Sequence, residues 1–161
     1  MNRTALAGLM LATAVTAGCA PQPDPLVGAW RSSIEIESGA FSGMRGLEFM
    51  YVFNAGGTMT ESSNYDAAPP VTPAYGTWRK TGPATYELKY AYYSTVPSAE
   101  ADFIKGAGWL PSGHGVLTET ITLDADGKGF TSTMKYELFD LQDKPAEGSG
   151  TAKGKAKRIG T

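Results

Sequence analysis

Glu119 is the residue whose chemistry depends most on where the fold places it. It shares the alternation of Leu117, Ile121 and Leu123, so an extended strand would direct its carboxylate toward an apolar interior. A carboxylate taken out of water is costly, so it must be paired, protonated or directed at a ligand. A strand bulge would reverse the parity and leave Glu119 in water. Tyrosines of inward parity could donate hydroxyls to it: Tyr86, Tyr90, Tyr92 and Tyr136.

Other candidate groups are weaker. Glu61 shares the parity of Met59 and is a second candidate for an inward carboxylate. His114 is the only histidine, and one imidazole without suitable partners makes neither a typical zinc site nor a Ser-His triad. The segment 124–127 begins like a calcium loop but lacks the later acidic ligands, so we interpret it as a hairpin turn. We therefore expect no metal site and no cofactor.

These side chains must be positioned by β-strands. Glycines and prolines interrupt short runs rich in Thr, Tyr, Val and Phe, a pattern typical of strands. The long gaps at 65–74 and 94–114 are expected to be loops, with a helical turn at 98–104 in the second. The pattern predicts eight strands, at about 26–37, 46–54, 57–64, 75–80, 84–93, 115–124, 129–140 and 147–159.

The predicted strands favour one closed sheet. Apolar and polar residues alternate along most of them, so each strand has one buried and one wet face. Short turns between consecutive strands favour an antiparallel meander, and closure into a barrel removes its exposed edges. We expect an all-β fold, a single antiparallel eight-stranded up-and-down β-barrel over residues 26–161.

The last predicted strand has small residues on one side. Lys153, Lys155 and Lys157 have one parity and must face water, which leaves almost no side-chain volume facing inward. Either bulky side chains approach this strand closely, or its small residues border a cavity; the sequence favours neither explanation. The inward positions are Gly148, Gly150, Ala152, Gly154 and Ala156.

The first and last predicted strands carry a combination of residues that could pair. Gly28-Ala29-Trp30 opens the first strand, and Arg158 lies near the end of the last one. A guanidinium over an indole gains about 0.5–2 kcal/mol and would close one barrel end. This combination resembles the calycin pattern shared by lipocalins and their relatives. The resemblance implies a lipocalin-like barrel whose interior holds a small molecule; alternatively, Trp30 is an ordinary core residue.

The N-terminal residues resemble a bacterial export signal. Asn2 and Arg3 are followed by an apolar run over 5–15 and by small residues up to Cys19. The run is shorter than the roughly 20 apolar residues of a membrane-spanning helix. The closing Ala17-Gly18-Cys19 resembles a lipobox, which implies that Cys19, the only cysteine, is lipidated. The alternative is a plain secretory signal with an incidental cysteine.

The lipobox resemblance implies three segments. These are a lipoprotein signal peptide at 1–18, a proline-rich tether at 19–25 and the barrel at 26–161. Ala20, in place of an aspartate, implies delivery to the outer membrane, facing the periplasm. The net charge of −2, with acids and bases interspersed, argues against nucleic-acid binding.

The expected function is binding of a small apolar or amphipathic molecule inside a lipid-anchored barrel. One alternative is a barrel enzyme of the isomerase or cyclase type that uses Glu119 as general acid/base. Another is a protein-binding envelope scaffold or inhibitor with apolar groups on its loops at Tyr65, Phe103 and Trp109. Binding is favoured over catalysis. The expected ligand contacts are Tyr86, Tyr90, Tyr92, Glu119 and Tyr136.

Overall fold

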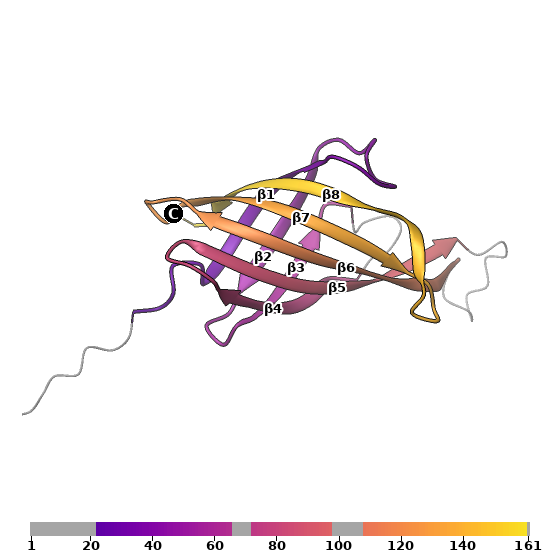
Figure 1. Ribbon diagram of the computed structural model, residues 1–161, viewed down its shortest axis with the longest axis horizontal. Helices are drawn as coiled ribbons and strands as arrows, with labels where there is room; N and C mark the ends of the chain where they lie inside the picture. Colours follow the sequence, from indigo (N-terminus) through magenta and orange to yellow (C-terminus); the bar gives the residue numbers. More distant parts are fainter. Residues whose placement is uncertain (1–21, 66–71, 98–107, 161) are drawn as a thin grey trace, which may run out of the picture.

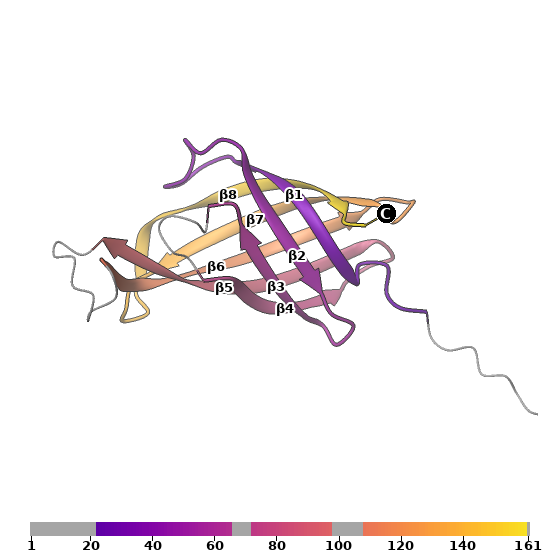
Figure 2. The same cartoon turned by 180° about the vertical axis from the view of Figure 1, so that it is seen from behind.

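The protein forms a closed barrel of antiparallel strands that pair in sequence order, with β8 returning to β1 (Figures 1 and 2). A computed structural model describes residues 22–65, 72–97 and 108–160. The prediction of an all-β, eight-stranded up-and-down barrel is confirmed. The strands are β1 (Gly28–Ile36), β2 (Leu47–Phe53), β3 (Thr58–Ser63), β4 (Ala74–Lys80), β5 (Thr85–Pro97), β6 (Trp109–Leu123), β7 (Gly129–Phe139) and β8 (Pro145–Arg158).

The prediction of a loop over 94–114 was wrong at both ends. β5 continues to Pro97 and β6 already begins at Trp109, with Val96 opposite Leu110. The register shifts between Ser94 and Thr95, so a bulge interrupts the alternation that the sequence pattern relies on. Figures 1 and 2 show this hairpin projecting beyond the rest of the barrel. The expected helical turn at 98–104, with Phe103, lies outside the described residues.

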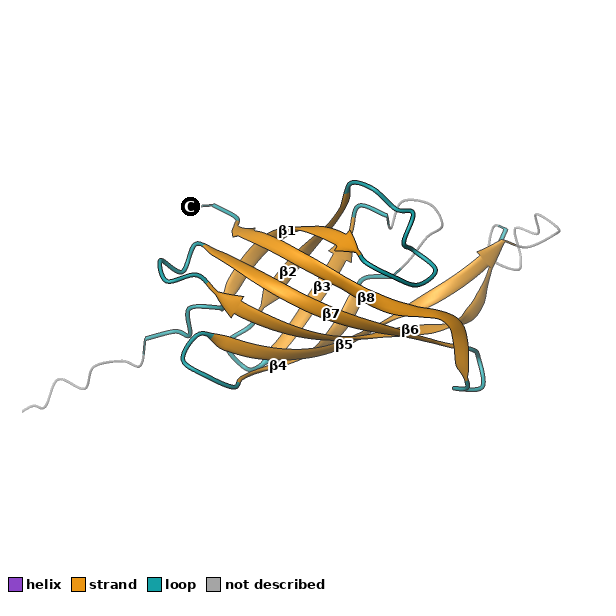
Figure 3. Ribbon diagram, turned by 45° about the horizontal axis from the view of Figure 1, so that its top comes forward, coloured by secondary structure: helices purple, strands orange, loops and turns teal. Residues whose placement is uncertain are grey.

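The alternating strands have two distinct ends. At one end lie the N-terminal segment, the end of β8 and the short β2–β3, β4–β5 and β6–β7 turns; we call it the closed end. At the other lie the β1–β2, β3–β4, β5–β6 and β7–β8 connections; we call it the open end. Figure 3 shows the described connections in teal at opposite ends of the strands. The core extends from the closed end through the middle of the barrel.

The small inward residues of β8 do two different things. A Cβ at Gly154 would lie 2.5 Å from Ser132 Oγ, and a Cβ at Gly150 only 2.1 Å from the Ser38 carbonyl oxygen. Both glycines are therefore needed for close approach. Ala152, between them in parity, lines a cavity. The two explanations left open by the sequence each apply to part of the strand.

Candidate ligand-binding site

Trp30 and Arg158 seal the closed end. The guanidinium carbon of Arg158 lies 4.2 Å from the centre of the Trp30 ring, and Trp30 is fully buried. Trp30 Nε1 donates to the Leu26 carbonyl at 2.8 Å. Arg158 Nη1 donates to the Val27 carbonyl at 2.8 Å, and Nη2 donates to the Pro25 carbonyl. Arg158 therefore attaches the N-terminal segment to the barrel as well as covering the indole.

The glycine before this tryptophan has its own physical reason. Gly28 has φ 130°, a backbone conformation that other residues rarely adopt. A Cβ at this position would lie 2.7 Å from Arg158 Nη1. Gly28 thus makes room for the guanidinium that stacks on Trp30.

Asp24 holds Tyr86 at the closed end. Asp24 Oδ1 accepts from the Tyr86 hydroxyl at 2.7 Å and from the Leu26 N–H at 2.9 Å, while Oδ2 accepts from Lys80 Nζ at 3.1 Å. Burial by itself would raise the pKa of Asp24, but these hydrogen bonds outweigh it and hold the pKa below its ordinary value. Asp24 and Pro25, the last two residues of the expected tether, therefore contact the barrel.

Glu119 lies in the middle of the barrel, with no exposed surface. Its Oε2 accepts from the Tyr90 hydroxyl at 2.8 Å and from the Tyr51 hydroxyl at 3.2 Å. Burial raises the pKa of Glu119 to about 7, although these hydroxyls and that of Ser132 act in the opposite direction. The Ser132 hydroxyl lowers the pKa of Glu119 although its Oγ has no hydrogen-bond partner of good geometry among the described residues. Sequence analysis found Glu119 and Tyr90 but missed Tyr51, whose inward parity was its only signal.

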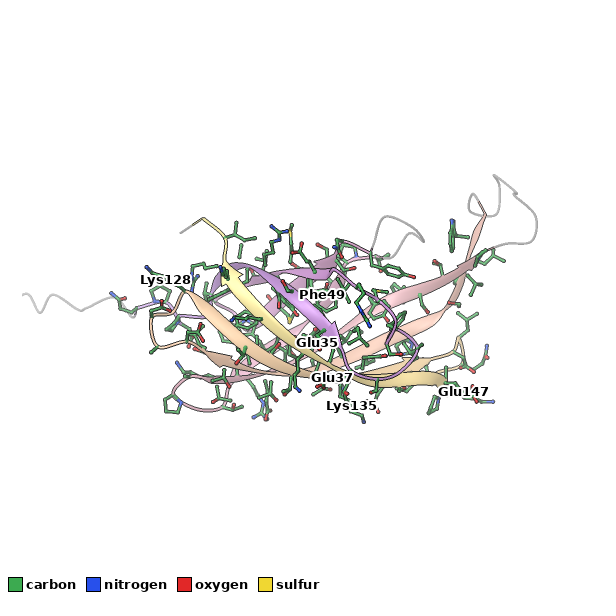
Figure 4. The ribbon with its side chains drawn as sticks, turned by 90° about the horizontal axis from the view of Figure 1, so that it is seen from above. Glu35, Glu37, Phe49, Lys128, Lys135 and Glu147 are labelled. Carbon is green, nitrogen blue, oxygen red and sulfur yellow. The ribbon has the colours of Figure 1, made fainter. Side chains whose placement is uncertain are left out.

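A cavity of about 360 Å³ opens at the open end, above this carboxylate. Its floor includes Leu117 and Met134, and Met134 pairs with Glu119 across β6 and β7. Glu119 itself does not line the cavity, so it lies one layer deeper. Most of the lining is apolar, contributed mainly by Ile34, Ile36, Phe41, Met44, Leu47, Phe49, Leu117, Met134, Leu138 and Ala152 (Figure 4, where Phe49 is labelled).

Polar groups in the cavity come from several strands. Glu61 on β3 is 7% exposed, and Tyr92 on β5 lies near enough for its pKa to respond to this carboxylate. Burial first, and then the charge of Glu61, raises the pKa of Tyr92 to about 12. Tyr136 on β7 donates its hydroxyl to the Ser38 carbonyl at 2.6 Å. The Tyr92 ring covers Gly115 on β6, where a Cβ would lie 2.4 Å from it.

The structure separates the tyrosines that the sequence grouped together. Tyr92 and Tyr136 line the cavity, whereas Tyr90 binds Glu119 below its floor. Tyr86 does not line this cavity, and its hydroxyl donates to Asp24 at the closed end. Sequence analysis missed Phe41 and Met44, because the β1–β2 connection has no alternation to indicate which side chains face inward.

His114 lies outside this cavity, at the base of the projecting hairpin. Its ring stacks on Phe139 with centroids 4.9 Å apart, and Nδ1 lies 3.8 Å from Asp143 Oδ1. Among the described residues, no group of three or more His, Cys, Asp or Glu side chains could hold a metal ion. The same part of the chain contains no helix long and apolar enough to cross a membrane.

Comparison with known proteins does not assign this barrel to a family. No protein-family model, curated protein or solved structure matches the chain.

Proposed function

We propose that the protein binds a small apolar or amphipathic molecule in the open-end cavity. The observation that carries this proposal is an apolar cavity of about 360 Å³ in a barrel whose other half is filled. Ligand pockets usually measure roughly 300–1,000 Å³ and combine apolar walls with a few polar groups. Here Glu61, Tyr92 and Tyr136 are among the polar groups of the lining.

The alternatives have less support. A cavity enzyme using Glu119 would need this carboxylate to reach the substrate, yet Glu119 is fully buried and does not line the cavity. The alternative of an envelope scaffold or inhibitor assumes a filled barrel, whereas this barrel contains a cavity. The projecting β5–β6 hairpin, with Val96 and Leu110 exposed, is the feature that supports a protein partner.

The relation to calycins is a further part of the proposal. It is supported by the up-and-down barrel and by the stacking of Arg158 on Trp30 beside Gly28. A barrel closed at one end and hollow at the other is what this resemblance implies.

We also propose that the protein is an exported lipoprotein, attached through Cys19 to the outer membrane and facing the periplasm. The signal-like residues 1–18 and the lipobox-like 17–19 support it. The chain reaches the barrel at Asp24, on the closed end. Anchoring there would turn the open end away from the bilayer, so the ligand would exchange with the aqueous compartment.

Binding is tested with the neutral fluorescent probe N-phenyl-1-naphthylamine. We expect the wild type to bind it and Ala152→Leu, which fills the cavity from β8, to lower the affinity by about tenfold or more, equivalent to about 1.4 kcal/mol. Thr133→Leu is the matched control, because it adds the same side chain on the exposed face of β7. Binding by neither wild type nor control, or equal binding by all three proteins, would overturn the proposal.

A further inference from the structure

The cavity contains a buried acid. Glu61 lies on β3 opposite Tyr51 and Ala74, lines the cavity, and is 7% exposed. An ionised carboxylate in an apolar cavity stabilises a positive or hydrogen-donating group beside it and opposes a second anion. Glu61 therefore bears directly on which head group an amphipathic ligand can carry.

The other charged groups of the lining act in the same direction. Among the described residues that line the cavity, the charged side chains are Glu61 and Asp140, and none is Lys, Arg or His. Asp140 lies in the β7–β8 turn, where its Oδ1 accepts from the N–H groups of Gln142 and Lys144 at 2.8 and 2.9 Å. This described lining offers no cation for a carboxylate or phosphate head group, and Glu61 is the acid that faces the ligand.

Aromatic rings surround the same space. Phe41 packs against Tyr136 with centroids 5.6 Å apart and against Tyr65 at 6.4 Å, and Phe49 and Tyr92 complete this part of the lining. The face of an aromatic ring is electron-rich and attracts ammonium groups. The rings therefore add to the preference that Glu61 creates.

We propose that the ligand of this cavity is an amphipathic amine, whose alkyl or aryl part fills the apolar walls while its ammonium group pairs with Glu61. The inference rests on the proposed function, because it specifies the ligand class of the same cavity. It predicts a ranking of amphiphiles that differ only in their head group.

The test is displacement of N-phenyl-1-naphthylamine by decylamine, decanol and decanoate, each below its micellar concentration. We expect decylamine to bind about tenfold or more tightly than decanoate. The ammonium group of decylamine can form a charged hydrogen bond with Glu61, whereas the carboxylate of decanoate is repelled by Glu61. Glu61→Gln should remove most of this preference, measured as the ratio of the decylamine and decanoate affinities. Glu35→Gln, an exposed carboxylate on β1 (Figure 4), is the control of equal charge change and should retain the preference.

The outcomes distinguish the two proposals. Absence of probe binding by the wild type overturns both. Probe binding that Ala152→Leu blocks, with decanoate bound as well as decylamine, overturns the amine proposal alone. A preference for decylamine that survives Glu61→Gln also overturns it. If Glu61→Gln does not fold, Glu61→Met removes the charge with a side chain of similar length. This variant should also lose the preference for decylamine.

Discussion

At the level of single residues, Glu119 shows how two opposing effects set the state of a buried acid. Burial raises its pKa, and the hydroxyls of Tyr51 and Tyr90 lower it without restoring the ordinary value. The pKa of about 7 means that the folded protein holds this proton more tightly than the unfolded chain does. Glu119 therefore opposes folding least when it is protonated.

This gives a prediction for stability against pH. Below the ordinary pKa of 4.5 Glu119 is protonated in both states and opposes folding least; the folding penalty grows as pH rises toward 7 and is complete above it. Glu119→Gln cannot ionise, and its amide oxygen can still accept from the tyrosines. We expect the free energy of unfolding of Glu119→Gln, relative to wild type, to increase between pH 5 and pH 8 in urea titrations. A difference that does not change with pH would contradict the account.

A second residue-level prediction concerns Trp30 and Arg158. Trp30→Ala should lower the free energy of unfolding by about 3–5 kcal/mol, as large buried truncations do. Arg158→Ala should cost about 2–3 kcal/mol, because it removes the stacking contact and also the hydrogen bonds to carbonyl groups. Denaturant unfolding of the double mutant should reveal coupling between them. Strict additivity would show that the ring and the guanidinium do not interact.

At the level of elements, predictability depended on regular alternation. The strands were found because inward apolar side chains recur at every second position, and Glu119 was placed correctly because β6 keeps its parity through that region. The hairpin beyond Ser94 was missed where a bulge interrupts the alternation. The cavity is also lined by Phe41 and Met44 of the β1–β2 connection, where no alternation indicates which side chains point inward.

Strand β8 provides a prediction that contrasts two neighbouring positions. Gly154→Leu should lower the free energy of unfolding by about 1–3 kcal/mol or more, because its side chain would meet Ser132, Met134 and Ser32. Ala152→Leu should cost clearly less, because its side chain can enter the cavity. Denaturant titrations compare the two variants directly. Equal costs would indicate that the space beside Ala152 is filled.

At the level of the whole molecule, the barrel has a sealed half and a hollow half. The N-terminal segment is part of the seal, since Asp24 and Pro25 accept hydrogen bonds from Tyr86 and Arg158. Any anchor upstream of Asp24 would thus be separated from the fold by only a few residues. This arrangement makes the proposed attachment testable without disturbing the barrel.

We predict that Cys19→Ser abolishes lipidation and releases a folded protein from the membrane fraction. The barrel contacts begin at Asp24, so the substitution leaves them intact. Metabolic labelling with an alkyne fatty acid, followed by fractionation, measures both effects. Wild-type protein that takes up no label would contradict the lipoprotein proposal.

The central claim is that a small molecule occupies the open-end cavity, and methionine methyl NMR tests it most directly. Met44 and Met134 line the cavity, Met59 is buried outside it, and Met50 is exposed on the outer surface. Titration of N-phenyl-1-naphthylamine into protein labelled at the methionine methyls should shift Met44 and Met134 and give contacts from the probe to both. Met59 and Met50 should change little. A probe that binds but shifts Met50 alone, or leaves Met44 and Met134 unchanged, would contradict the account.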